Sequence, residues 1–436
     1  MKFGKKFFTT LMATAEAHAH WEIESSLDIL KNRKKLLTLL AFCLPIVAFI
    51  GIAWAAPGVL GGKKAYAPAF YSSSVFLISI LIGLAAGLIT GCIGAGGGFV
   101  ITPALMSMGV KGILAVGTDL FHIFAKAIMG TAVHRKLGNV SVKLAVAFVV
   151  GSTLGVVGGG TINRAIYEYN PVLSDLFISL VYVFLLGFLG IYAMTDFLKL
   201  RRAGKAHRTL SPEEQQVTAA PAVATTGLAQ KLQSWHVPPM ITFDEDLVPG
   251  GNRISGVFVA ACGAIVGLVA AIMGVGGGFL TFPMFVYMLG VSSFTTVGTD
   301  ILQIIYTAGF AAISQYAIYG FIFYTLAMGL LLGSLLGIQV GALTTKVVKG
   351  MYIRGFYATA IIAGFLNRLF ALPKKLAQME VISVSAGVTR VLDSIGTIVF
   401  FAIMAGFGFW VFYMFFKNLH KLRVEEAPVK PTVEVA

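Results

Sequence analysis

The stretch GAGGGFVITP at residues 94–103 recurs as GVGGGFLTFP at residues 274–283. Each copy lies inside a long apolar region and is followed by Gly-Val and then by Val-Gly-Thr-Asp, which ends at Asp119 and at Asp300. The offset between the copies drifts only from 180 residues here to 182 residues where Gly151-Ser152 corresponds to Gly333-Ser334. We infer a duplicated unit in which a glycine loop interrupts a membrane helix. Broken helices in paired repeats are where membrane transporters build substrate sites.

The composition is that of a membrane protein. Of 436 residues, 57% are hydrophobic and 12% are charged, whereas soluble domains carry about 25% charged residues. Many apolar segments reach the ~20 residues that a helix needs to span a bilayer. The net charge of +14 comes from basic residues at the ends of these segments, as the positive-inside rule produces. The sequence therefore predicts an all-α polytopic membrane protein with about 10–12 membrane segments and no nucleic-acid partner.

We expect seven regions along the chain. Five polar or peripheral regions surround two transport repeats, and the bounds are 1–35 (cytoplasmic N-terminal segment), 36–56 (extra helix), 75–198 (repeat 1), 199–252 (linker), 253–372 (repeat 2), 388–417 (extra helix) and 418–436 (cytoplasmic tail). The linker is polar and proline-rich, which predicts little fixed structure. The three cysteines are dispersed in apolar segments and show no disulfide or metal spacing.

Charge and segment count together predict the topology. With residues 1–35 in the cytoplasm, the basic clusters after 134, 198 and 416 also lie inside. Each repeat has an odd number of segments, so the two repeats insert in opposite directions and form an inverted pair. The segment 97–109 is too short for a ~30 Å hydrocarbon core, so it either crosses a thin region or forms a re-entrant hairpin. The expected location is a bacterial inner membrane, with both termini cytoplasmic.

The glycine loops are the first candidate site. Consecutive glycines permit positive φ and a close approach of a ligand, and the free N–H groups of a helix that starts after the loop suit an anion. The alternative is that the glycines only permit tight helix packing. The candidate residues are Gly94, Gly96, Gly97, Gly98, Gly274, Gly276, Gly277 and Gly278.

A polar stripe is the second candidate site. Asp119, His122 and Lys126 share one helix face, and the second unit has Asp300, Gln303 and Thr307 at the same places. Ionisable groups at membrane depth usually face the bundle interior. We expect Asp119 and Asp300 to bind a coupling proton or sodium ion. The remaining expected substrate contacts are Thr118, His122, Lys126, Thr299 and Gln303. Two alternatives stay open, a helix cap at Thr118 or Asp119 and a local Asp119–His122 pair.

The chain contains no catalytic motif. We find no Gly-x-Ser-x-Gly, His-Glu-x-x-His, Walker A or Cys-x-x-Cys pattern. The Gly-x-Gly-Gly-Gly run has no flanking strand and therefore is not a dinucleotide fingerprint. We expect neither an enzyme nor a cofactor nor a metal site.

At the glycine motifs and the boxes Gly117–Leu120 and Gly298–Ile301, the sequence resembles the sulfite exporter TauE/SafE family of bacterial membrane permeases. The resemblance covers roughly 75–198 and 254–372. It implies transport of sulfite, organosulfonates or related sulfur-containing anions. Many members carry Ser or Asn where this chain has Asp119 and Asp300, and this chain adds flanking helices and a long linker.

The sequence thus predicts a secondary transporter of a small sulfur-containing anion that works by alternating access between two inverted repeats. One alternative is a cation or metal transporter that uses Asp119, His122 and Asp300. Another is a membrane sensor or partner subunit without transport, with the linker as its output. The sequence leaves the oligomeric state open.

Overall fold

The computed structural model of the chain describes residues 73–93, 97–133, 141–206, 227–244, 251–345, 348 and 350–418. The expected regions 1–35 and 36–56, the tail after 418, and Gly94 and Gly96 lie outside these residues. Within them, seven helices are long and apolar enough to cross a membrane. The prediction of an all-α polytopic membrane protein is confirmed.

The helices lie where the apolar segments predict them. The first unit contains α3 (Ser73–Ile93), α4 (Gly98–Ser107), α5 (Gly112–Val133), α6 (Val142–Tyr169) and α7 (Pro171–Ala206). The second contains α10 (Gly256–Met273), α11 (Gly278–Pro283), the π-helix η2 (Met284–Leu289), α12 (Ser293–Phe310), the π-helix η3 (Ala311–Ala317), α13 (Tyr324–Thr345) and α14 (Gly350–Gln378). The last helix, α15 (Ala386–Lys417), follows.

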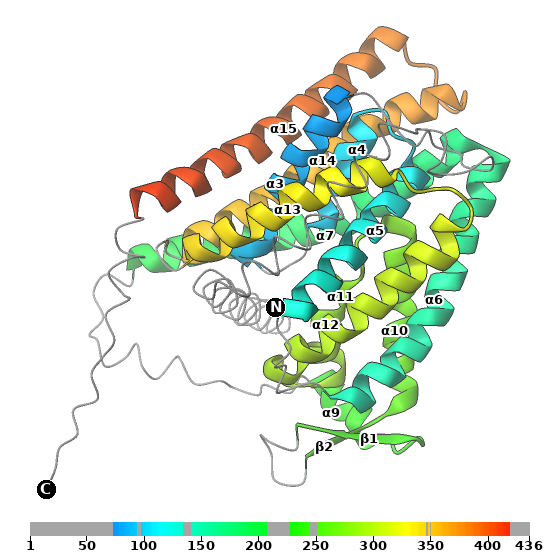
Figure 1. Ribbon diagram of the computed structural model, residues 1–436, viewed down its shortest axis with the longest axis vertical. Coiled ribbons are helices and arrows are strands. Elements are labelled where there is room, and N and C mark those ends of the chain that lie inside the picture. The colour runs from blue at the N-terminus through cyan, green and yellow to red at the C-terminus, as the bar shows by residue number, and fades with distance from the viewer. Residues whose placement is uncertain are drawn as a thin grey trace, which may run out of the picture.

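The two units exchange helices. The first helix of unit 1, α3, packs most extensively on α13 of unit 2, and the first helix of unit 2, α10, packs in the same way on α6 of unit 1 (Figure 1). The last helices of the units, α7 and α14, pack on each other. These three helix pairs are therefore preserved when the two units are interchanged.

Glycines make both of these exchanged helix pairs possible. A Cβ on Gly333 of α13 would lie 1.9 Å from the Ile80 carbonyl oxygen of α3, and a Cβ on Gly151 of α6 would lie 1.7 Å from the Ala260 carbonyl oxygen of α10. Only glycine permits this backbone approach, as in the small-residue interfaces of membrane helices. Some glycines of this chain thus serve helix packing, which was the alternative considered for the glycine loops.

Large apolar side chains cover the outer faces of the spanning helices. Leu81, Leu154, Phe184 and Phe409 are all more than 60% exposed. Exposed apolar surface on this scale would aggregate in water, and it is the surface that a lipid-facing helix needs.

The linker is more ordered than the sequence predicts. Its described part contains α9 (Gly227–Ser234) and strand β1 (Met240–Phe243), which pairs antiparallel with β2 (Asn252–Ser255). Gln233 Nε2 donates to the Leu289 carbonyl at 2.9 Å, and the Asp244 carboxylate accepts from the Ser292 amide at 2.8 Å. The prediction of little fixed structure is wrong for 227–244, because these bonds and the buried Ile241, Phe243 and Ile254 dock this segment onto unit 2.

Candidate functional site

The two glycine loops meet. A Cβ on Gly98 would lie 2.8 Å from Val275 Cα, and a Cβ on Gly274 would lie 2.9 Å from Val116 Cα and 3.0 Å from Thr102 Oγ1. Each loop is thus packed against the other unit's backbone. We call this contact, formed by Gly97, Gly98 and residues 274–278, the glycine junction.

The second loop uses the conformational freedom that only glycine has. Gly274, Gly276 and Gly277 have φ values of +82°, +66° and +89°, a left-handed region that other residues rarely adopt. Gly274 ends α10, and Gly277 precedes α11, which continues directly into η2. The sequence prediction of a broken membrane helix is borne out in unit 2. In unit 1, α4 begins at Gly98, so Pro103 lies inside the helix and does not start it.

Two helices, α4 and α11, start at the junction. The Gly97 and Gly277 carbonyls accept the first helical bonds, from Val100, Ile101, Leu280 and Thr281. Among the described residues, the Gly98 and Gly278 amides have no hydrogen-bond acceptor. Eight consecutive residues of α4, from Gly98 to Leu105, are buried. A non-helical backbone at membrane depth is tolerated where protein surrounds it, and these amides point the positive end of each helix into the junction.

The backbone carbonyls at the end of α10 accept hydrogen bonds from side chains of other helices. Tyr182 of α7 donates to the Met273 carbonyl at 2.6 Å and lies 3.5 Å from the Gly98 carbonyl, so it bridges both loops. Tyr316 donates to the Ala271 carbonyl, and Asn163 Nδ2 lies 3.5 Å from the Ile272 carbonyl. Within the described ranges, the junction therefore has amide donors without an acceptor at Gly98 and Gly278, and bonded carbonyl acceptors at the end of α10.

Asp119 lies inside α5, two turns after its start at Gly112. The alternative that Asp119 or Thr118 caps this helix is therefore wrong. Thr102 of α4 donates to Asp119 Oδ2 at 3.0 Å, and His122 Nδ1 lies 3.5 Å from Asp119 Oδ1. His122 Nε2 is 2.9 Å from Ser334 Oγ of α13. The local Asp119–His122 pair is present, and Lys126 lies half-buried one turn farther along.

Asp300 has an equivalent position in α12 and different partners. Gln303 Nε2 donates to Asp300 Oδ1 at 2.6 Å and to Thr281 Oγ1 at 3.0 Å. Thr307 donates to Gln303 Oε1 at 3.0 Å, and Ser152 of α6 lies 3.0 Å from the Thr307 hydroxyl. The polar stripe of each unit thus reaches a serine of the other unit.

Thr118 and Thr299 connect the two units. Thr118 Oγ1 accepts from the Phe323 amide at 3.0 Å, just before α13. Thr299 Oγ1 accepts from the Ser141 amide at 3.2 Å, just before α6. These bonds give both threonines a structural role that the sequence prediction of substrate contacts did not include.

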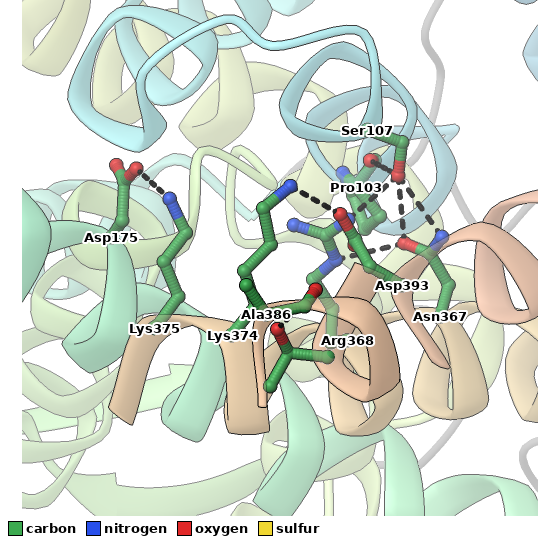
Figure 2. A network of polar contacts seen from close by, with 10 residues as sticks. Pro103, Ser107, Asp175, Asn367, Arg368, Lys374, Lys375, Ala386 and Asp393 are labelled. Atoms are coloured by element: carbon green, nitrogen blue, oxygen red, sulfur yellow. Dashed lines mark hydrogen bonds and ion pairs between the residues drawn. The ribbon is translucent and has the colours of Figure 1, made fainter. Parts of the chain in front are cut away.

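A second polar cluster, which the sequence analysis missed, ties α4 to α14 and α15 (Figure 2). The buried Arg368 of α14 donates from Nη2 to Ser107 Oγ at 2.7 Å and from Nε to Asn367 Oδ1 at 2.8 Å. Nearby, Lys374 pairs with Asp393 of α15 at 2.6 Å, and Lys375 pairs with Asp175 of α7 at 2.7 Å. An arginine inside a predicted membrane segment was the available signal, because such residues are costly and are kept for a reason.

Arg368→Met is expected to lower the free energy of unfolding by about 2–3 kcal/mol, since hydrogen bonds to charged groups are lost and buried acceptors are left unpaired. Arg390→Met, at an exposed position of α15, is the control, with an expected change within about 0.5 kcal/mol. Thermal unfolding of both variants in detergent measures the difference. Equal midpoints would show that the Arg368 cluster does not hold α4.

An apolar cavity lies beside this region and not at the junction. Its volume is about 460 Å³, and Leu81, Val100, Phe400, Met404 and Phe409 are among its lining residues. The lining comes from α3, α4 and α15 and is apolar, so the cavity does not suit an anion.

Lipid-facing helices, a duplicated unit and helices broken inside the protein define a polytopic membrane permease. The family model described as Sulfite exporter TauE/SafE matches residues 79–368, and the chain belongs to this family.

The chain is 24% identical to the probable membrane transporter protein YjnA of Bacillus subtilis over 60% of its own length and 87% of the relative's. It is also 24% identical to YunE of the same organism, over 61% and 87%. A probable membrane transporter protein of Xylella fastidiosa is 24% identical over 61% of the chain and 84% of the relative. No solved structure gives a significant match. These relatives support a membrane transporter and do not name its substrate.

Proposed function

We propose that this transporter moves a small anion, a sulfite or an organosulfonate, through the glycine junction. The observation that carries the proposal is the contact between the two glycine loops, where the Gly98 and Gly278 amides have no hydrogen-bond acceptor in the described part of the chain. Two helix starts at one point place positive dipole ends from both units around a single anion. The matching family is described as a sulfite exporter, which is consistent with this chemistry.

In this proposal transport works by alternating access, with one unit moving against the other, and the exchange of first helices gives the two units a shared interface. In this proposal the units insert in opposite directions, in a bacterial inner membrane with cytoplasmic termini. The junction belongs to both units, so such a movement opens it to one side of the membrane at a time. An anion that leaves a cell with a negative interior gains roughly 2.3 kcal/mol per charge per 100 mV, so export without a coupling ion would run on the membrane potential, whereas uptake requires a coupling ion.

Flux measurements on purified protein in liposomes test the proposal. Vesicles loaded with ³⁵S-sulfite are expected to release it faster than empty liposomes, and ²²Na⁺ is expected to stay inside. Isethionate, a sulfonate with one fixed negative charge, is the second probe. Release of ²²Na⁺ without movement of either anion would overturn the proposal in favour of a cation transporter.

A further inference from the structure

The two buried carboxylates have equivalent positions in the two units, but their surroundings differ. In unit 2 the side chains form a continuous series of hydrogen bonds. Asp300 binds Gln303, Gln303 binds Thr281 and Thr307, and Thr307 binds Ser152. Among the described residues, none of these side chains has a buried polar atom without a partner. The amide of Gln303 carries no charge at any pH, so Asp300 has no titratable partner in this cluster.

In unit 1 the bonds leave a gap. Asp119 and His122 are 0% and 1% exposed. Asp119 Oδ2 is bound by Thr102, but Asp119 Oδ1 and His122 Nδ1, which are 3.5 Å apart, have no hydrogen-bond partner in the described part of the chain. Two unpaired buried polar atoms that face each other are costly unless something occupies the space between them.

We assign the tautomer of His122 from its contact with Ser334. The Ser334 hydroxyl has an acceptor of its own, the Leu331 carbonyl at 3.2 Å, so we place the proton of His122 on Nε2, which lies 2.9 Å from Ser334 Oγ. A neutral imidazole with a proton on Nε2 has a bare Nδ1. Two bare acceptors, Nδ1 of His122 and Oδ1 of Asp119, then face each other, and one proton on Nδ1 turns this repulsion into a charge-assisted hydrogen bond.

The pair lies next to the glycine junction. Thr102, which donates to Asp119, is the side chain that a Cβ on Gly274 would meet at 3.0 Å. Ile123, the neighbour of His122, is within 3.3 Å of Cβ positions built on Gly98 and Gly276. The charge of the pair therefore acts directly on an anion in the junction.

The titratable and charged groups around the pair come from several elements. Lys126 of the same helix interacts electrostatically with both members, and Tyr182 of α7 interacts with Asp119. Other titratable groups on elements packed against α5 include Tyr316 of η3, Tyr324 of α13, the hydrogen-bonded Asp300 of α12 and Asp175 of α7, which binds the Gly112 amide at the start of α5.

We propose that the Asp119–His122 pair is the proton-binding site that couples transport, and that Asp300 is a structural carboxylate. The coupling role rests on the proposed anion transport. A proton from one side of the membrane adds to Nδ1 of His122, and the new N–H donates to Asp119 Oδ1. The pair changes from a net charge of −1 to 0, which allows an anion into the junction. The same N–H bond breaks when the proton leaves with the anion on the other side. A sodium ion fits the gap poorly, because hard cations require several oxygen ligands and Nδ1 is not one.

The protonation state of His122 can be measured without any substrate. Solid-state NMR of ¹⁵N-histidine-labelled protein in liposomes, from pH 5 to pH 9, is expected to show one imidazole that changes from the Nε2–H tautomer to imidazolium. The signal is assigned by its absence in His122→Gln. In Asp119→Asn this imidazole is expected to stay neutral, whereas in Asp300→Asn it is expected to titrate as in the wild type. A His122 that keeps one protonation state, or titrates identically in Asp119→Asn, would overturn the proposal.

Steady-state accumulation of isethionate tests the coupling. One pH unit is equivalent to 1.36 kcal/mol, so one proton per anion gives about tenfold accumulation on the alkaline side. This ratio does not depend on the rate of transport. Asp119→Asn and His122→Gln are expected to lose the accumulation, whereas Asp300→Asn is expected to keep it. Loss in Asp300→Asn alone would reverse the assignment. Exchange of isethionate by the wild type without a pH gradient tests the anion transport separately, so each failure can be recognised.

Discussion

Gly277→Val is expected to lower anion flux roughly hundredfold while the protein remains inserted in the membrane. Gly277 has φ +89°, and a Cβ there would lie 2.7 Å from Val266 Cγ1. The left-handed backbone costs a non-glycine residue about 1–2 kcal/mol, and overpacking adds about 1–3 kcal/mol. The loop can relieve both only by moving α11 away from the junction. Flux of ³⁵S-sulfite and the amount of protein in purified membranes are the two measurements.

Gly109→Val is the matched control, because Gly109 has φ +88° and nothing within 4 Å of its Cβ position. This variant has the same backbone strain without the steric contact, and we expect it to be less stable but active. Gly97→Val has a contact without the strain: its φ is −87°, and its Cβ would lie 2.7 Å from Ala86 Cβ. Its flux should fall between those of the other two. Wild-type flux in Gly277→Val would show that the loop does not form the anion site.

Gly151→Leu is expected to prevent folding. Its Cβ would lie 1.7 Å from the Ala260 carbonyl oxygen, so α6 and α10 would have to separate along their length. Overpacking of this kind exceeds the usual ~3 kcal/mol, because the obstacle is backbone and cannot change rotamer. Yield of monodisperse protein after detergent extraction measures the loss.

Gly158→Leu lies two turns farther along α6, where nothing is within 4 Å of the Cβ position, and it is expected to extract like the wild type. Gly333→Leu in α13 is expected to fail like Gly151→Leu, since its Cβ would lie 1.9 Å from the Ile80 carbonyl oxygen. A folded Gly333→Leu together with an unfolded Gly151→Leu would show that the two exchanged helix pairs differ in strength.

Apolar length and glycine spacing predict the helices well. The expected short segment 97–109 corresponds to α4 (Gly98–Ser107), and the expected extra helix 388–417 corresponds to α15 (Ala386–Lys417), with differences of at most two residues at each end. These boundaries follow from local signals: glycine runs, charges at the ends of segments, and the length that a bilayer requires. Local signals do not reveal which helices pair. The Cys92 thiol, for example, lies 3.4 Å from the Gly341 carbonyl, 249 residues away in the chain.

The candidate site was predicted only in part, because local signals do not reveal which helices pair. The spacing of Asp119 and His122 predicts a pair on one helix face, and the structure contains it. Arg390 and Asp393 have the same spacing, but Asp393 binds Lys374 of α14. Spacing along a helix shows which side chains can meet, whereas a neighbouring helix can provide a better partner. The strands β1 and β2 were missed because they are four residues each and are separated by a long interval.

The exchange of helices has a consequence for biosynthesis. The ribosome completes α3 about 249 residues before the part of α13 that contacts it. At ~5–20 residues per second, the glycine face of α3 spends on the order of ten to fifty seconds in the bilayer before its partner is made. If the first half were translated alone, the glycine face of α3 would have no partner helix. A working transporter made from two separate genes therefore requires both halves to be inserted in the same membrane at the same time.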